Sequence, residues 1–240
     1  MNMKCFVINL KKNADRMNKV ASRLRALNIE FERIEAVYGK ELSLEEKRAS
    51  VNSFRWWCTK GYKIRDGEIG CTCSHNKIYE RMMNEGIGYC CILEDDVVAS
   101  DLFPKQLEKV ASFLRSHPQE PIIVQFTNHS GTTGPDWTIS AIMNSAHSEA
   151  YALNMMAAKS YLKANRPLCT PVDMWGYWQK KGVFRLYQAY PPVCKQDWSP
   201  GYVTDVCPPG SFDASKLSLV GKIIWKIKRC IGKGLDEILY

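Results

Sequence analysis

The stretch Tyr89-Cys-Cys-Ile-Leu-Glu-Asp-Asp96 decides the fold of this chain. It opens with a nearly continuous apolar run, which is typical of a strand buried on both faces of a parallel sheet. The run leads directly into three carboxylates, Glu94, Asp95 and Asp96. Because ligands of open parallel sheets bind at the carboxyl ends of the strands, the acidic cluster lies where a ligand site is expected.

The segments that precede this stretch alternate between strand and helix. Lys4–Leu10 is a second apolar run, Met17–Leu27 repeats apolar residues at helical spacing, and Phe31–Val37 has the character of another strand. Residues 51–68 are expected to be irregular. The other predicted elements are a short helix with a capping box at Ser43 and Glu46, a helix from Gly70 to about Gly86, a helix capped by Asp101, strands at 121–127, 149–153 and 183–190, a helix capped by Asn154, and a short helix opened by Asp173. The order predicts an α/β fold with a mainly parallel sheet flanked by helices.

The ten cysteines do not have the spacing of a disulfide framework or of a zinc site. Several lie in apolar runs, where a free thiol acts as a small hydrophobe, and adjacent Cys90 and Cys91 should point to opposite faces of their strand. We therefore expect reduced, structural cysteines and a cytoplasmic protein. We recognise no signal peptide and no apolar run long enough to cross a bilayer.

The net charge of +8 is concentrated at the carboxyl end of the chain. Residues 216–240 hold six basic and two acidic side chains, with Leu219, Ile223, Ile224, Ile227 and Ile231 near helical spacing. This pattern predicts a catalytic domain over 1–215 and a basic amphipathic helix over 216–240. The tail either lies on an anionic membrane surface or packs on the domain. No nucleic-acid-binding motif accompanies the charge, so a nucleic-acid partner is not expected.

The acidic cluster has two interpretations on spacing alone. Three neighbouring carboxylates repel one another, and Mg²⁺ or Mn²⁺ relieves such repulsion because both ions prefer carboxylate oxygens. On an extended backbone Glu94 and Asp96 would point the same way and could share one metal, while Asp95 would point oppositely. The alternative is an ordinary acidic loop after a strand.

Several blocks of the chain, taken in order, resemble glycosyltransferase family 25, the bacterial lipooligosaccharide galactosyl- and glucosyltransferases related to the collagen galactosyltransferases. The ordered set of blocks is specific. The blocks are VINLKKNADR (Val7–Arg16), FERIEAVYGKEL (Phe31–Leu42), GEIGCTCSH (Gly67–His75), ILEDDV (Ile92–Val97), AYALN (Ala150–Asn154) and PVDM (Pro171–Met174).

This resemblance implies a GT-A-like fold, a UDP-sugar donor, Mn²⁺ or Mg²⁺, and inversion at the anomeric carbon. It implies metal ligation by Glu94 and Asp96. The residues that it places at the donor are Asn9, Arg16, Ala36, Ser74, His75 and Asp95. Arg16 could equally be a solvated helix residue, and Ser74 and His75 could be satisfied within their helix.

Inversion requires a general base that takes the proton of the acceptor hydroxyl. Asp173 matches the family's aspartate and is the candidate, with a plain helix cap as the alternative. His147 and Glu149 are expected to be bystanders, and Gln196-Asp197 either contact the metal or donor or play no part. The aromatic residues Trp175, Tyr177 and Trp178 either stack on acceptor sugars or belong to the core.

The resulting hypothesis is a galactosyl- or glucosyltransferase that acts from a UDP-sugar on a glycolipid oligosaccharide at the inner face of the cytoplasmic membrane. One alternative is a metal-dependent transferase or hydrolase that acts on another nucleotide. Another is a sugar-binding homologue without activity, against which the intact acidic cluster argues.

Overall fold

The computed structural model describes residues 3–128 and 131–197, and from the remainder only 206, 223, 226, 227, 230, 231 and 234. The described contacts divide the chain into two compact units. The first unit comprises Met1–Val37, Cys73–Ala164 and Val172–Tyr202, and the second comprises Tyr38–Thr72, Asn165–Pro171 and Val203–Tyr240. The predicted boundary at 215/216 and most of the predicted tail lie outside the described residues.

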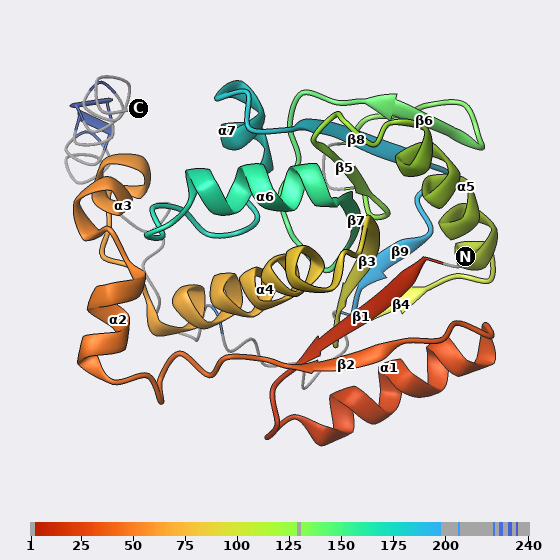
Figure 1. Ribbon diagram of the computed structural model, residues 1–240, viewed down its shortest axis with the longest axis horizontal. Coiled ribbons are helices and arrows are strands. Elements are labelled where there is room, and N and C mark those ends of the chain that lie inside the picture. Colours follow the sequence, from red (N-terminus) through yellow and green to blue (C-terminus); the bar gives the residue numbers. More distant parts are fainter. Residues whose placement is uncertain are drawn as a thin grey trace. The chain divides into compact units, whose positions relative to one another are not determined.

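The first unit is built on a sheet whose described strands follow the order β2-β1-β3-β7-β5-β8-β6 (Figure 1). Strands β2, β1, β3, β5 and β8 run in one direction, while β7 and β6 run against their neighbours. The strands are β1 (Lys4–Asn9), β2 (Glu32–Glu35), β3 (Tyr89–Glu94), β5 (Ile122–Gln125), β6 (Thr138–Ala141), β7 (Ala150–Asn154) and β8 (Arg185–Tyr190). The prediction of a mainly parallel α/β sheet is confirmed.

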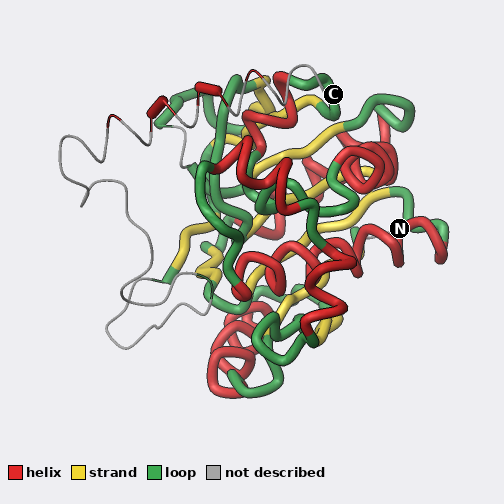
Figure 2. The backbone as a smooth tube through the Cα atoms, turned by 90° about the vertical axis from the view of Figure 1, so that its left-hand side faces the viewer, coloured by secondary structure: helices red, strands yellow, loops and turns green. Residues whose placement is uncertain are grey.

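Helices cover both faces of this sheet, and the strands lie between them in the turned view of Figure 2. One face carries α1 (Ala14–Ala26) and α5 (Phe103–Ser116), whose apolar stripes pack on the strands. The other face carries α6 (Met155–Ala164), α7 (Trp175–Lys180) and the first-unit part of α4 (Asp66–Glu85). The capping of α6 by Asn154 is confirmed, because its Oδ1 accepts from the backbone N–H of Ala157 at 3.0 Å.

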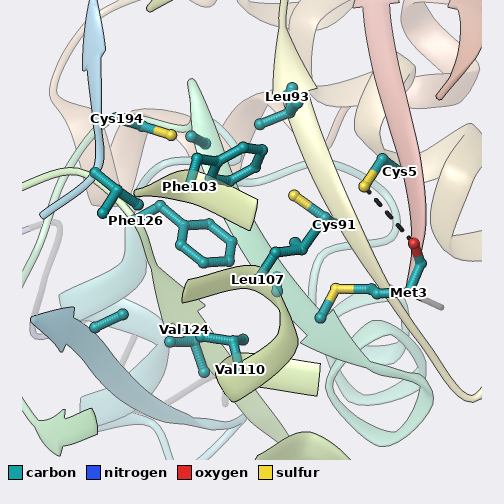
Figure 3. Close-up of a cluster of buried hydrophobic side chains, with 14 of the residues drawn as sticks. Met3, Cys5, Cys91, Leu93, Phe103, Leu107, Val110, Val124, Phe126 and Cys194 are labelled. Carbon is teal, nitrogen blue, oxygen red and sulfur yellow. Dashed lines mark hydrogen bonds between the residues drawn. The ribbon is translucent and has the colours of Figure 1, made fainter. Parts of the chain in front are cut away.

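The face under α1 and α5 is a continuous apolar cluster (Figure 3). Phe103 of α5 meets Phe126 edge to face, with 5.4 Å between the ring centroids. Cys91 belongs to this cluster, whereas the thiol of Cys90 contacts Met82 of α4 on the opposite face, as predicted. The cysteines among the described residues are free thiols.

A two-stranded ribbon follows the acidic cluster. Strand β4 (Val97–Ala99) pairs antiparallel with β9 (Cys194–Gln196), and neither strand was predicted. Each is three residues long, too short to show a periodicity of its own. The predicted cap at Asp101 is wrong, because Leu102 occupies the N-cap of α5 and no side chain caps that helix.

The second unit contains α2 (Leu44–Ser50) and α3 (Ser53–Lys60). The predicted capping box of Ser43 and Glu46 is confirmed at the start of α2. The expectation that residues 51–68 are irregular is wrong. Asn52 caps α3 by accepting from the backbone N–H of Arg55, and Gly61 ends that helix in the left-handed conformation.

Among the described helices, none combines the length and apolar character needed to span a membrane.

Candidate functional site

The candidate site lies at the carboxyl edge of the sheet. Glu94 is the last residue of β3, and Asp95 and Asp96 form the turn that leads into β4. Strand β1 runs parallel to β3, so Asn9 at its end lies at the same edge. Asp95 and Asp96 are 5% and 6% exposed, which means that this acidic turn is buried rather than an ordinary surface loop.

Asp95 and Asp96 both face the guanidinium group of Arg16. Arg16, in the first turn of α1, forms an ion pair with Oδ1 of Asp95, and its Nη2 lies 3.5 Å from Oδ2 of Asp96. The amide of Asn9 donates to Oδ2 of Asp95 at 2.7 Å. The expected alternation, with Asp95 opposite to Glu94 and Asp96, is therefore wrong. It assumed an extended backbone, whereas these two residues form a turn.

Glu94 projects toward α4, on the other face of the sheet. The hydroxyl of Ser148 donates to its Oε1 at 2.5 Å, and Nε2 of His75 lies 3.5 Å from the same oxygen. The Nδ1 atom of His75 lies 2.8 Å from the hydroxyl of Tyr151, which in turn lies 2.5 Å from the hydroxyl of Tyr79. These two hydroxyls fix the plane of the imidazole, so His75 is held against Glu94 by a buried polar chain.

The three carboxyl groups differ in acidity. Burial and the charge of Glu94 raise the pKa of Asp96 to about 7. Burial also raises the pKa of Asp95, although Arg16 and Asn9 act in the opposite direction. Burial would raise the pKa of Glu94 too, but His75 and Ser148 outweigh it and lower that pKa. The site therefore holds more negative charge than Arg16 balances.

The arrangement fits a divalent cation. No described residue hydrogen-bonds Oδ1 of Asp96, although this atom is buried. A buried carboxylate oxygen without a partner is costly, and Mg²⁺ or Mn²⁺ would satisfy it with the ligand type that both ions prefer.

The β9 strand supplies contacts that the sequence left undecided. Gln196 donates to Oδ2 of Asp96 at 2.8 Å, and the backbone N–H of Asp197 donates to the carbonyl of Asp96 at 2.7 Å. The carboxylate of Asp197 accepts from Arg23 of α1 at 2.9 Å. Gln196 is therefore part of the carboxylate cluster, while Asp197 ties the ribbon to α1.

Ser74 and Ala36 lie around the end of β1. The hydroxyl of Ser74 accepts from the backbone N–H of Val37 at 2.8 Å, and the N–H of Ala36 donates to the carbonyl of Asn9 at 3.0 Å. Ser74 thus holds the chain that leaves β2, which leaves Ala36 next to Asn9. Ser148, Tyr151 and Arg23 were not predicted, because no local motif indicates contacts between residues so far apart in the sequence.

Asp173 lies in the turn before α7 and does not cap that helix. Met174 occupies the N-cap, and no side chain caps α7, so the capping alternative is wrong. No hydrogen bond or ion pair of Asp173 is present among the described residues, and its side chain is half-buried. Its neighbour Trp175 donates to the carbonyl of His147 at 2.7 Å, next to Ser148. These contacts connect the turn of Asp173 to the segment that bonds Glu94.

The aromatic residues of α7 divide between core and boundary. Trp175 and Trp178 are fully buried, which assigns both to the core. Trp175 packs on Tyr151 with ring centroids 5.0 Å apart, and Tyr177 is half-buried. Stacking on a sugar therefore remains open only for Tyr177.

The model of glycosyltransferase family 25 (LPS biosynthesis protein) matches residues 2–175 of the chain. This chain belongs to glycosyltransferase family 25. The match includes the sequence blocks that carry Asn9, Arg16, His75, Glu94 and Asp173. The family model therefore confirms the resemblance inferred from those blocks.

Curated relatives share part of their length with the chain. Procollagen galactosyltransferase 1-B of Xenopus laevis is 31% identical over 110 residues, which cover 43% of this chain and 17% of that protein. Procollagen galactosyltransferase 2 of Homo sapiens is 32% identical over 108 residues, covering 44% and 17%. Inactive glycosyltransferase 25 family member 3 of Mus musculus is 30% identical over 189 residues, covering 70% and 30%. The chain thus spans less than a third of the length of these relatives.

Among solved structures, a glycosyltransferase involved in the glycosylation of the major capsid of PBCV-1 matches with a TM-score of 0.33 and 12% identity. The match covers 66% of this chain and 62% of that one, and at this score it carries no argument about function.

Proposed function

We propose that this member of family 25 is an inverting, metal-dependent glycosyltransferase that moves galactose, or glucose, from a UDP-sugar to a lipooligosaccharide or related surface glycan. The observation that carries the proposal is the buried pair of Asp95 and Asp96 at the carboxyl edge of the sheet. This pair meets Arg16 on one side and leaves Oδ1 of Asp96 without a described partner.

We assign the acidic cluster and the residues around it to the binding of the donor. Asp96 would hold Mn²⁺ or Mg²⁺ directly through Oδ1, and Glu94, which faces His75, would bind one of the metal's waters. Asp95 would contact the donor or keep Arg16 in place. When bound, the metal would neutralise the charge that builds on the diphosphate as the glycosidic bond breaks. Arg16 would give the same diphosphate a guanidinium contact. Asn9, Ala36, Ser74 and His75 would shape the remainder of the donor site.

Asp173 is the proposed general base. Inversion is a direct displacement, so one base must take the proton of the acceptor hydroxyl as that oxygen attacks the anomeric carbon. A half-buried carboxylate that neither caps α7 nor pairs with a described residue is available for this proton.

We predict that Asp173→Asn lowers kcat by about 10²–10⁴-fold and leaves the affinity for UDP unchanged, because general-base catalysis contributes roughly this factor. Asp136→Asn, an exposed aspartate of the same unit, is the control and should retain wild-type kcat. Wild-type kcat in Asp173→Asn would remove Asp173 from the mechanism.

The decisive experiment is a donor screen with UDP-galactose, UDP-glucose and their N-acetyl forms, each with Mn²⁺ and with EDTA. We expect Mn²⁺-dependent release of UDP from one or two donors, which Asp96→Ala abolishes while the far-UV circular dichroism spectrum stays unchanged. No release from any donor with plausible glycan acceptors would contradict the proposal. Turnover of a different nucleotide without acceptor dependence would favour the nucleotide transferase or hydrolase instead.

We further propose that residues 216–240 hold the protein on the inner face of the cytoplasmic membrane. Ile223, Ile227 and Ile231 are helical, 50%, 53% and 56% exposed, and spaced so as to share one helix face. We expect the full chain to float with anionic liposomes. A chain that ends at Asp213, and the triple variant with Ser at the three isoleucines, should float less, and equal flotation of all three would refute the membrane role.

A further inference from the structure

A cavity of about 590 Å³ lies beside the candidate site in the first unit. Its walls come from the β4–β9 ribbon, from the chain that follows β5 and from the chain that follows β8. The lining segments are Val98–Ser100, Thr127–Asn128 and Pro192–Lys195. None of these residues has a role in the proposed donor site.

The ribbon connects this cavity directly to the acidic turn. Strand β4 begins one residue after Asp96, and Gln196 at the end of β9 bonds Asp96. Val98 is paired with Lys195, so both side chains lie on the same face of the ribbon, opposite to buried Val97. Val98 is the second residue after Asp96, so this wall of the cavity follows the acidic turn directly along the chain.

The chemistry of the lining suits a sugar ring. Val98, Ala99, Pro192 and Val193 supply apolar surface for the C–H face of a pyranose. Few but well-placed polar groups complete the lining, as is usual in ligand pockets of this size. Lys195 is exposed and brings the one positive charge among the described lining residues.

Thr127 provides a second, independent indication of a ligand. Its side chain is 1% exposed, and its hydroxyl has no hydrogen-bond partner among the described residues. A buried hydroxyl without a partner costs free energy, which a hydrogen bond to a ligand hydroxyl would recover. Thr127 is also one of the residues that line the cavity, so this hydroxyl belongs to the cavity wall.

The topology assigns the cavity to the second substrate. The proposed donor residues Asn9 and Ala36 lie at the ends of β1 and β2, on one side of β3 in the strand order. The cavity lies at the ends of β5 and β8, on the other side of β3. The acidic turn after β3 therefore stands between the two in the order of the sheet, as a transfer between two sugars requires.

We infer that this cavity binds a pyranose unit of the acceptor glycan, with the hydroxyl of Thr127 bonded to a sugar hydroxyl and Lys195 next to an anionic substituent of the same glycan. The inference rests on the proposed function, since an acceptor exists only if the protein transfers a sugar.

Thr127→Val tests the inference, because it keeps the shape of the side chain and removes only the hydroxyl. With methyl β-galactoside and methyl β-glucoside as probe acceptors, we expect KM for the probe to rise about 5- to 20-fold, which matches the loss of one buried hydrogen bond. KM for the UDP-sugar and acceptor-independent release of UDP should stay within about twofold. Thr138→Val, on β6 outside the cavity lining, is the matched control and should change neither KM.

Two outcomes would overturn the inference. One is an unchanged probe KM in Thr127→Val, with a wild-type melting temperature. The other is loss of affinity for UDP rather than for the probe, which would assign the cavity to the donor. Saturation-transfer NMR measures binding of the methyl hexosides to the full chain without any turnover. The inference then fails if Thr127→Val leaves the probe signal unchanged, whereas the proposed function fails if wild-type protein releases no UDP from any donor.

Discussion

Two neighbouring rows of the same sheet are equally buried and have opposite chemistry. One row joins Cys91, Ala152 and Val124 under α1 and α5, and it is entirely apolar. The next row, one residue further along the strands, includes Tyr151 and the glutamines Gln125 and Gln188 under the other face. Strand alternation sends the two rows to opposite faces. The row under α1 and α5 therefore lies in an apolar cluster, while the row on the other face includes polar side chains, of which Tyr151 bonds His75 of the candidate site.

Along each strand, successive residues therefore serve different purposes. One packs in the apolar cluster and contributes to stability, and the next faces the side of the sheet where His75 is held in place. On the apolar face each side chain is interchangeable with another of similar volume. On the polar face Tyr151 and His75 form directional bonds, which only particular side chains can make. Substitutions on the two faces should therefore have different signatures.

The largest effect on stability is expected from Phe103→Ala in the apolar cluster. Phe103 is fully buried and contacts Phe126, so its removal leaves a cavity that should cost about 3–5 kcal/mol of unfolding free energy. Denaturant unfolding measures this loss, and the folded fraction should keep wild-type affinity for Mn²⁺. Weaker Mn²⁺ binding at full folding would show that the two faces are not separate.

Asp96→Asn is expected to raise the unfolding free energy of the metal-free protein, by less than Phe103→Ala lowers it. The pKa of Asp96 is about 7 in the folded state against 3.8 for an ordinary aspartate. The wild type therefore binds an extra proton on folding between these values, and its stability falls as pH rises from about 4 to 7. The amide has no such dependence, so at pH 8 the variant should be more stable by roughly 1–3 kcal/mol, with a smaller difference near pH 4.

Thermal unfolding in EDTA at several pH values measures this difference, and Asp136→Asn is the exposed control. Added Mn²⁺ should stabilise the wild type and leave Asp96→Asn unchanged. A variant less stable than wild type at pH 8 without metal would show that burial and the charge of Glu94 do not make ionised Asp96 costly.

The smallest effect is expected from Tyr151→Phe on the polar face. The ring remains packed on Trp175, while the hydroxyl that orients His75 is lost. We expect a loss of about 1 kcal/mol in stability and roughly a tenfold loss in kcat, because groups that orient a site residue contribute factors of this order. Tyr79→Phe keeps the bond between Tyr151 and His75 and should slow turnover less. An equal loss in both variants would indicate a general loosening of this face.

Much of the fold could be predicted from the sequence. The apolar runs of β1 and β3 and the stripes of α1 and α5 are local patterns, and the structure confirms them. The helix α3 was missed although Asn52 and Gly61 mark its two ends. Strands β4 and β9 could not be found, because each exists only through pairing with the other across about a hundred residues.

The candidate site divides in the same way. The sequence by itself determined the acidic cluster, its position at the end of a buried strand, and the family, since these depend on residue order and local periodicity. The tertiary structure alone decided that Asp95 and Asp96 share Arg16 while Glu94 faces His75, and that Gln196 joins them. There are two physical reasons. Side chains in a turn do not alternate between faces as they do in a strand. Contacts between residues distant in sequence depend on packing, which local sequence patterns do not encode.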